Sequence, residues 1–439
     1  MRKTHLFYAW RESSHYALLK NFFLIGVFVL LGKSIGGAKE IAIAWRYGVS
    51  PAVDSYVLIF NMINWPVTIL AGVLMTALVP FGTEIWHQSA SEARFFFEES
   101  LGWVLFLDIV LLLGVHILIS HVIENNWVGL GVKELQFAKN MYIPLLSTLF
   151  FNILIVFFSP WILIVGKHWN TFAEMIPSTC ILLALIFSPL FFDPLVWGTV
   201  AGFFVQCGLL IFCLFFLNFH LRPRWTFASP RWPNFLRTLC PLFIIQALMI
   251  LPGAIDQIWV AHLGGGAISI FNYTNRLFSL LSSFAMVVIA RAVLPILSQK
   301  MHDPFVLRFT KQWMCIVFGF GLLLGSICLL CSYDIVHIFF ERGEFTSSDS
   351  ETVAEVFRYS VCSLPFYFAF ILGGQALFVL KLYERLIMIY IVILIIKIVG
   401  NLFLVNFFSI SAFMISNVLM YIFGTLFLFN YLYFGQKTI

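Results

Sequence analysis

Long runs of apolar residues, separated by short polar stretches, repeat along the whole chain of 439 residues. A helix needs about 20 predominantly apolar residues to cross the hydrocarbon core of a bilayer, and most of these runs reach that length. The pattern therefore predicts twelve transmembrane helices. The predicted spans are 20–46, 53–82, 101–122, 138–165, 171–189, 195–218, 238–262, 267–298, 312–333, 352–379, 386–405 and 410–434.

The amino-acid composition agrees with this pattern. Hydrophobic residues make up 61% of the chain and charged residues 11%, whereas about a quarter of the residues in a soluble domain are charged. We therefore expect an all-α integral membrane protein with about 12 transmembrane helices. The eight cysteines lie mostly inside apolar runs without metal-ligand spacing to histidines. We interpret them as packing residues and predict no metal and no cofactor.

Lysine and arginine residues fall almost entirely on one side of the predicted bundle. With a cytoplasmic N-terminus, the opposite side holds little beyond Lys133, Lys139 and Arg342. Cytoplasmic loops carry such an excess, so we predict a multi-pass protein with cytoplasmic N- and C-termini. The net charge of +5 then reflects topology and contact with membrane lipids. It gives no reason to expect a nucleic-acid partner or a soluble protein partner.

The two halves of the chain carry an internal repeat. The first half reads EIAIAWRYG and later TALVPFGTE, and the second half reads DQIWVAHLG and later RAVLPILSQ. In this alignment Glu40 matches Asp256 and Gly48 matches Gly264. The shift is about half the chain and coincides with a helix boundary, which favours two related halves over a bundle without repeats.

The repeat predicts three parts. These are an N-terminal six-helix bundle over 1–218, a basic cytoplasmic linker over 219–237 and a C-terminal six-helix bundle over 238–439. Because six is an even number, the halves are parallel repeats about an axis along the membrane normal. Two such bundles facing each other enclose a central cleft, which is the geometry of an alternating-access transporter.

Lys33, Lys39 and Glu40 lie inside the first apolar run, in LGKSIGGAKEIAIAWRYG, which also carries Arg46 near its end. Lys33 and Glu40 differ by only about 20° around a helix and share a face, while Lys39 lies on a second stripe. Lys33 is roughly 18 Å into the span, too deep for its side chain to reach the interface. A lone charge at that depth costs ~3 kcal/mol or more, so these side chains should face a polar cavity.

The second half also carries charges inside its spans. Arg276 lies in FNYTNRLF, Asp256 lies in the span 238–262, and Lys397 precedes Asn401 by one helical turn on the same face. Buried ion pairs that only fix helix register are one interpretation of such residues. Because the cations outnumber the carboxylates, we favour a central cationic cavity with an anionic cargo. Lysine and arginine suit phosphate or pyrophosphate oxygens.

Three segments carry a resemblance to a known family: VDSYVLIFNMIN, FNYTNRLFSLLSSFAMVVIARAVLPILSQ and IFFERGEFTSSDSETVAEVFRYSVCSLPFY. They resemble the MurJ/MviN family of lipid II flippases, within the multidrug/oligosaccharidyl-lipid/polysaccharide exporter superfamily, and the likeness covers most of the chain. The loop FERGEF, residues 340–345, is quite specific to this family. The residues themselves favour a structural role for it, as an outer turn followed by a helix cap from Thr346 to Asp349.

The resemblance implies export of a polyprenyl-pyrophosphate-linked saccharide from the inner to the outer leaflet of the bacterial inner membrane. Lipid II, the peptidoglycan precursor used in cell wall biogenesis, is the lead candidate. Three cavity arginines, an aspartate and a cavity serine of the family have counterparts here. With Glu40 they form the predicted substrate-binding set: Lys33, Lys39 and Arg276 at the arginine positions, Asp54 at the aspartate and Ser269 at the serine.

The chain departs from the family pattern at several points. A further cavity arginine falls at or near Val67, and the acidic residue expected three positions after Arg276 is Ser279. Family members usually have fourteen helices, the last pair helping to hold the lipid tail, whereas twelve are predicted here. Twelve is usual for O-antigen and exopolysaccharide repeat-unit flippases of the same superfamily. A related lipid-linked oligosaccharide is therefore the alternative cargo.

Members of this superfamily can use a sodium or proton site, which needs oxygen ligands. Asp256 and Asn401 supply oxygens, but an ammonium group at Lys397 would pair with Asp256 and replace a free cation. We therefore predict transport independent of sodium, with protons or the membrane potential as the driving force. Lys397 facing the cleft as one more phosphate ligand is the alternative.

A membrane enzyme of cell-wall sugar assembly is a distant alternative function. Such enzymes typically carry their catalytic groups in a large outer loop. The longest outer segment here, around Asp334 to Glu351, has no Ser/His/Asp set and no metal-ligand spacing. The sequence therefore predicts a transporter and no enzyme activity.

Overall fold

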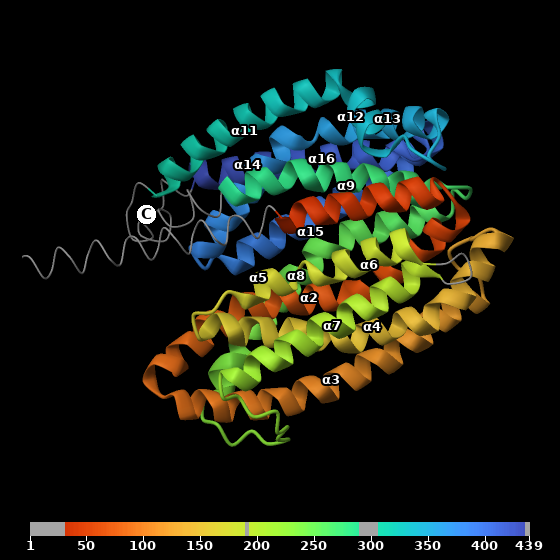
Figure 1. Cartoon of the computed structure of the whole chain (residues 1–439). Helices are drawn as coiled ribbons and strands as arrows, with labels where there is room; N and C mark the ends of the chain where they lie inside the picture. Colours follow the sequence, from red (N-terminus) through yellow and green to blue (C-terminus); the bar gives the residue numbers. More distant parts are fainter. Residues whose placement is uncertain (1–30, 189–192, 289–305, 435–439) are drawn as a thin grey trace, which may run out of the picture. The chain divides into compact units, whose positions relative to one another are not determined.

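The computed structural model describes residues 31–188, 193–288 and 306–434, which fold mainly into α-helices (Figure 1). The first described helix runs over residues 31–47 and is followed by α2 Pro51–Gln88, α3 Ala90–Glu124, α4 Val132–Ile164, α5 Trp169–Ala173, α6 Ile176–Phe187 and α7 Pro194–Phe216. Later helices are α8 Trp232–Ala261, α9 Ala267–Val288, α11 Val306–Leu330, α12 Ser332–Phe340, α13 Ser347–Val361, α14 Leu364–Val379, α15 Tyr383–Phe408 and α16 Ser411–Phe434.

These helices confirm the predicted all-α membrane fold. Within the described ranges, nine helices are long and apolar enough to cross a membrane, and a tenth span arises if α13 and α14, which meet at a bend of 47°, are taken together. Every predicted span overlaps a helix of the structure. The count of twelve and the two-repeat layout stay predictions. The end of the repeat, RAVLPILSQ at 291–299, lies outside the described residues.

Two stretches contain helix breaks that the pattern did not predict. The span predicted over 171–189 corresponds to Trp169–Phe187, which is long and apolar enough to cross a membrane. Two residues in it separate α5 from α6, and α6 has Pro177 in its first turn. Proline lacks the N–H that a continuous helix needs. After α11 ends at Leu330, the separate helix α12 occupies part of the segment expected to be an outer loop. Each break is only one or two residues long, so the hydrophobic pattern alone does not mark it.

The chain forms two compact units, and each is described by itself. Unit 1 comprises Met1–Ala42, Leu78–Ile109 and Ser147–Ser229, and unit 2 comprises Ile43–Ala77, Val110–Leu146 and Pro230–Ile439. The halves predicted from the sequence, 1–218 and 238–439, are the two bundles expected to move against each other during transport. That division stays a prediction.

Aromatic rings fill the core of unit 1. Phe97 of α3 packs on Phe157 and Trp161 of α4 and on Phe219, with ring centroids 4.9–5.5 Å apart. All four side chains are almost completely buried. Packed aromatic pairs of this kind add stabilisation beyond the area they bury, so they hold α3 and α4 together within this unit.

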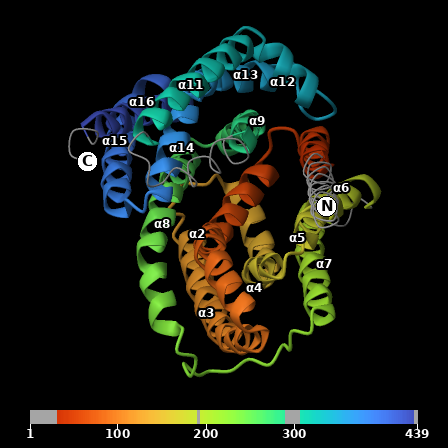
Figure 2. The same cartoon turned by 90° about the vertical axis from the view of Figure 1, so that its left-hand side faces the viewer.

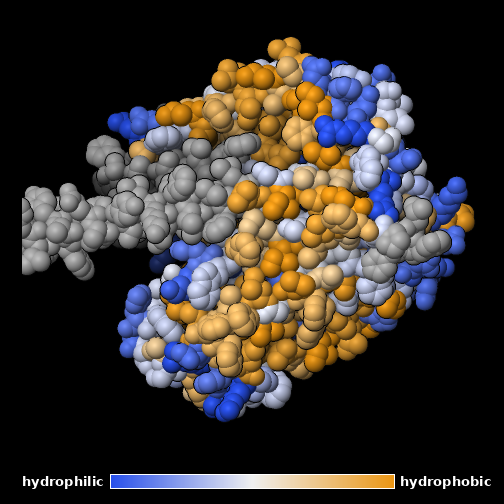
Figure 3. All heavy atoms as spheres, in the orientation of Figure 1, coloured by the Kyte–Doolittle hydropathy of each residue, from blue (hydrophilic) through white to orange (hydrophobic). Residues whose placement is uncertain are grey.

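Large apolar side chains also cover outward faces of the helices. Phe106 and Ile109 of α3, Phe215 of α7, and Leu323 of α11 are all exposed. Figure 3 shows hydrophobic residues over much of the visible surface. Soluble monomers rarely expose apolar patches of this extent, so these faces are suited to contact with lipid.

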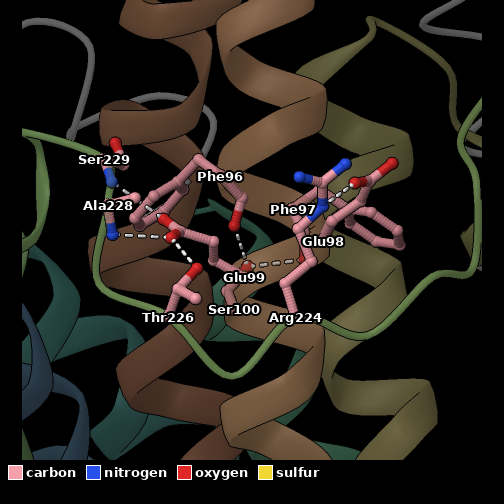
Figure 4. A network of polar contacts seen from close by, with 9 residues as sticks. All are labelled: Phe96, Phe97, Glu98, Glu99, Ser100, Arg224, Thr226, Ala228 and Ser229. Atoms are coloured by element: carbon pink, nitrogen blue, oxygen red, sulfur yellow. Dashed lines mark hydrogen bonds and ion pairs between the residues drawn. The ribbon is translucent and has the colours of Figure 1, made fainter.

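Part of the predicted linker is held against α3 (Figure 4). Glu99 of α3 is fully buried, and its carboxylate accepts hydrogen bonds from Thr226 Oγ1 (2.5 Å) and from the N–H groups of Ala228 (2.7 Å) and Ser229 (3.1 Å). We call residues 224–229 the linker strap. Because of these bonds, this part of the linker is a docked segment of unit 1.

The linker strap lies close to the backbone of α3. A Cβ atom at Gly102 would lie 2.3 Å from the carbonyl oxygen of Arg224, so glycine is required at this approach. The Arg224 N–H donates to the Glu98 carbonyl (2.9 Å), and its Nε lies 2.6 Å from the Glu98 carboxylate. The ring of Phe227 stacks on Trp103 with centroids 4.5 Å apart.

Replacing Glu99 by alanine should release the linker strap. The Ala228 and Ser229 N–H groups would lose their acceptor, and an unsatisfied buried donor costs about 1–3 kcal/mol. We expect amide hydrogen exchange at Ala228 and Ser229 to become roughly 5- to 150-fold faster. Glu98→Ala is the matched control and should change exchange far less, because its partner Arg224 is half exposed. Unchanged exchange in Glu99→Ala would show that the strap is held by other contacts.

Unit 2 is a bundle in which neighbouring helices pack along their lengths. α15 lies against α16 and α8, α11 lies against α14, and α9 lies against α13 (Figures 1 and 2). α8 contains two internal prolines, Pro241 and Pro252. Internal prolines remove backbone hydrogen bonds and are tolerated in membrane helices when other groups satisfy the freed carbonyls.

The FERGEF loop, residues 340–345, packs against the turn that follows the first described helix. The Glu344 N–H donates to the Trp45 carbonyl at 3.1 Å. A Cβ at Gly343 would lie 2.2 Å from that carbonyl oxygen, and a Cβ at Gly48 would lie 2.3 Å from the Glu344 carbonyl oxygen. Both glycines also have positive φ, 60° and 55°. The loop therefore needs glycine on both sides of the contact.

The ends of this loop are fixed as well. Phe340 and Phe345 pack on Tyr273 of α9, with ring centroids 5.0 and 5.2 Å away. Thr346 and Asp349 then form a reciprocal capping box at the start of α13. The capping role predicted from the sequence is confirmed.

Candidate functional site

Unit 2 contains a cavity of about 580 Å³ lined by residues of α2, α8, α9, α13, α14 and α16. Many lining side chains are polar although the helices are apolar overall. The polar lining includes Asn61, Gln257, Asn272, Asn275, Ser279 and Asn417. Such a cavity offers hydrogen bonds to a polar ligand inside a membrane-embedded bundle.

Arg276 and Asp256 are the charged residues of this lining within the described ranges. Arg276 lies on α9, the helix that also supplies Asn272 and Asn275 to the lining. A guanidinium group presents several N–H donors in a planar fork that matches phosphate oxygens. The arrangement can therefore bind a phosphate or pyrophosphate group, with the two amides as further donors.

The structure brings Asp256, Lys397 and Asn401 together in one buried cluster. Lys397 Nζ lies 2.8 Å from Asp256 Oδ2, and it also donates to the Phe413 carbonyl (2.7 Å) and to Ser416 Oγ (2.7 Å). Asn401 Nδ2 donates to Asp256 Oδ1 at 2.8 Å. The Lys397 ammonium thus sits in a cage of oxygen atoms, as the internal-cation interpretation expects. What this pair does in transport stays a prediction.

The structure also brings Asp54 and Ser269 together. Asp54 accepts hydrogen bonds from the N–H groups of Gly266 (3.0 Å) and Ser269 (2.7 Å), and from the Ser269 hydroxyl. Because a carboxylate at a helix N-terminus satisfies free N–H groups, Asp54 on α2 fixes the start of α9. Neither residue is among those that line the cavity. Their predicted contact with substrate stays a prediction.

Lys33, Lys39 and Glu40 belong to unit 1, so they are described apart from Arg276. Lys39 Nζ lies 2.8 Å from Glu40 Oε1, a pair between neighbours in sequence, and Glu40 is buried. Lys33 is exposed and interacts electrostatically with Glu174 in the same unit. A shared site formed by these residues and Arg276 stays a prediction.

Sequence reasoning missed two polar features. Asn61 Nδ2 donates to Gln257 Oε1 (2.8 Å), which links α2 to α8 at the cavity. A search for charges inside apolar runs passes over such amides. Asp108 was also missed, although it stands as the lone acid in LGWVLFLDIVLLLG of α3 and is completely buried. The same search would have found it.

The sequence model of the family described as "Lipid II flippase MurJ" matches residues 43–437. A relative from Helicobacter pylori described as a probable lipid II flippase MurJ is 28% identical over 158 residues, covering 35% of this chain and 33% of the relative. A relative of the same description from Buchnera aphidicola is 23% identical over 374 residues, covering 81% of this chain and 72% of the relative. The chain thus spans about a third of the Helicobacter pylori relative's length.

Solved structures have the same fold. A structure of the lipid II flippase MurJ in an inward closed conformation aligns with a TM-score of 0.77 at 17% identity, covering 95% of this chain and 91% of that one. An inward-facing multidrug resistance MATE family transporter aligns with a TM-score of 0.71 at 14% identity, covering 93% and 94%. Together with the family match over residues 43–437, these findings establish that the chain belongs to the lipid II flippase MurJ family.

Proposed function

We propose that this protein moves lipid II from the inner to the outer leaflet of the bacterial inner membrane by alternating access. The observation that carries the proposal is the family match over residues 43–437. The structure adds a polar cavity with Arg276 in its lining, to which α2, α8 and α16, helices long and apolar enough to cross a membrane, contribute residues. N- and C-termini in the cytoplasm, inferred from the loop charges, complete the proposed topology.

In this proposal the pyrophosphate of the cargo is held by cations inside the membrane. The Arg276 guanidinium donates two parallel hydrogen bonds to pyrophosphate oxygens, and Asn272 and Asn275 donate from the same helix. Lys33 and Lys39 add positive charge in one of the conformations of the cycle, with Glu40 keeping Lys39 in place. Asp54 and Ser269 act by fixing the start of α9, which carries Arg276.

The alternative cargo, an O-antigen or exopolysaccharide repeat unit, is not favoured by the comparisons, because the family model and the curated relatives are those of lipid II flippases. The membrane-enzyme alternative finds no support in the same matches. Both cargo classes share a polyprenyl pyrophosphate, so the saccharide is what a test must vary.

Transport of two cargoes in reconstituted vesicles tests the proposal. Purified protein would be placed in vesicles with lipid II in one set and an undecaprenyl-pyrophosphate-linked O-antigen repeat unit in the other. We expect lipid II to reach the outer leaflet at least about tenfold faster than in protein-free vesicles, and the repeat unit to remain near that background. Equal or faster movement of the repeat unit would reverse the assignment, and movement of neither cargo would overturn the proposed function.

A further inference from the structure

A single acidic residue lies inside the apolar part of α3. Asp108 has no exposed surface, whereas its neighbour Ile109 is 57% exposed on the outward face of the helix. Asp108 therefore points into unit 1, to which this part of α3 belongs. Neither of its carboxyl oxygens has a hydrogen-bond partner among the described residues.

Other buried acids of the protein have partners. Glu99, nine residues earlier on the same helix, accepts three hydrogen bonds from the linker strap, and Asp256 is paired with Lys397. Asp108 differs, because both of its carboxyl oxygens are buried without a hydrogen-bond partner among the described residues. The titratable neighbour that interacts with it is the Cys207 thiol of α7.

An isolated carboxylate in such surroundings is unstable. Moving an unpaired carboxylate ion from water into an apolar environment is so costly that the group takes up a proton instead. Ionisable residues within membrane spans are expensive, and they commonly mark proton relays and ion pathways. If the residue at this position served only packing, leucine would stabilise the fold more than aspartic acid, because the buried carboxyl group makes no hydrogen bond to the described residues.

We propose that Asp108 is a proton-binding site of unit 1. In the conformation seen here the carboxyl group is a neutral acid. When a conformational change admits water, its O–H bond breaks, the proton passes to water, and a carboxylate remains. When the site closes again the carboxylate must first regain a proton. Because the closed conformation accepts the neutral form, proton uptake and closure are linked.

Proton binding is inferred from the complete burial of Asp108 and the lack of hydrogen-bond partners for its oxygens among the described residues. The coupling of this site to transport rests on the proposed function. If protons exchange at Asp108 once in each cycle, movement of lipid II is accompanied by a proton flux. This gives unit 1 a titratable group of its own, separate from the cation cluster of unit 2.

Carbodiimide labelling tests the protonation state directly. A protonated carboxyl adds to dicyclohexylcarbodiimide: a bond forms between the carboxyl oxygen and the central carbon, and the acid proton moves to a nitrogen. The O-acylurea product then rearranges to a stable N-acylurea. We expect mass spectrometry of the full-length protein in vesicles to find this adduct on Asp108 and none on Glu99, which is held as an acceptor by three donors. A water-soluble carbodiimide should label Asp108 at least tenfold more slowly, because the site is closed to water.

Absence of the adduct on Asp108, or equal labelling by the water-soluble reagent, would overturn the proposal. Asp108→Asn, an uncharged substitute of the same shape, should fold like the original protein and lose the adduct. Because labelling is read on the original protein, this result does not depend on how the variant folds.

Proton flux in lightly buffered vesicles tests the coupling. We expect lipid II movement by the original protein to change the internal pH, Asp108→Glu to retain this change, and Asp108→Asn to reduce it at least tenfold. An Asp108→Asn variant with the original pH change would overturn the coupling. Failure of the original protein to move lipid II would instead count against the proposed function, and the labelling result would still decide whether Asp108 binds a proton.

Discussion

Arg276→Ala should almost abolish transport of the lipid-linked pyrophosphate, while membrane insertion and folding should stay near normal. Arg276 lies in the lining of the unit 2 cavity, and each hydrogen bond between charged groups contributes about 1.5–3 kcal/mol. Loss of two such bonds should reduce transport by at least about 100-fold. The measurement is the initial rate of lipid II movement in vesicles, with protein yield and thermal unfolding measured in parallel. Arg276→Lys should recover only part of the rate, because an ammonium lacks the planar fork.

Lys33 provides the companion test in unit 1. Lys33→Ala should also stop transport, whereas Lys33→Arg should retain it, because this position supplies positive charge without a fixed geometry. Arg342→Ala is the matched control, since Arg342 is exposed in the FERGEF loop and its guanidinium donates to the Ile338 carbonyl of the preceding helix α12. Rates close to the original in both Arg276→Ala and Lys33→Ala would refute a cationic substrate site.

The helices could be predicted because a bilayer imposes a simple rule on sequence. Each spanning helix needs a long apolar run, so all twelve predicted spans overlap a described helix. The interruption between α5 and α6 was not predicted, and neither was α12, because each break is only one or two residues long and does not end the apolar run around it. Proline 177 marks one of these breaks, but prolines also occur inside α8 without ending it.

The candidate residues could be found from sequence, and so could the pairing of Lys397 with Asp256, but their other partners could not. A charge inside an apolar run is visible in the sequence, which is how Lys397 and Asp256 were identified. Their contact depends on the packing of α8 against α15, helices that are far apart in the chain. Asp54 illustrates the same limit. Its family counterpart suggested a substrate-binding role, which stays a prediction. The hydrogen bonds that Asp54 accepts at the start of α9 are a tertiary contact that no local pattern encodes.

The FERGEF loop shows what a resemblance adds to physical reasoning. The resemblance singled out the loop, and the sequence explained only its helix cap. Its two close approaches, Gly343 to the Trp45 carbonyl and Gly48 to the Glu344 carbonyl, require the folded chain to be known. Each of these glycines is needed for two reasons. A backbone carbonyl group about 300 residues away in sequence leaves no room for a Cβ atom, and the positive φ of the glycine disfavours other residues.

Lys397→Asn should make the protein depend on sodium. In the original protein the Lys397 ammonium lies 2.7–2.8 Å from oxygens of Asp256, Phe413 and Ser416, so a free cation has no room to bind. Removing one partner of a buried ion pair costs about 3–5 kcal/mol, because the remaining charge is uncompensated. A sodium ion that enters the vacated oxygen cage, where the new asparagine adds one more oxygen, would restore the charge balance.

We therefore expect the original protein to transport equally well in sodium chloride and in N-methylglucamine chloride at equal ionic strength. The Lys397→Asn variant should transport, and resist thermal unfolding, in sodium chloride only, because an ion that binds the folded state alone stabilises it by mass action. Lys397→Asn combined with Asp256→Asn is the control: it removes both charges and should abolish the sodium effect on unfolding. Loss of transport by Lys397→Asn at every sodium concentration, with unfolding unaffected by sodium, would favour Lys397 as a phosphate ligand. A strict sodium requirement in the original protein would rule out the internal cation, because the ammonium and a sodium ion compete for the same oxygens.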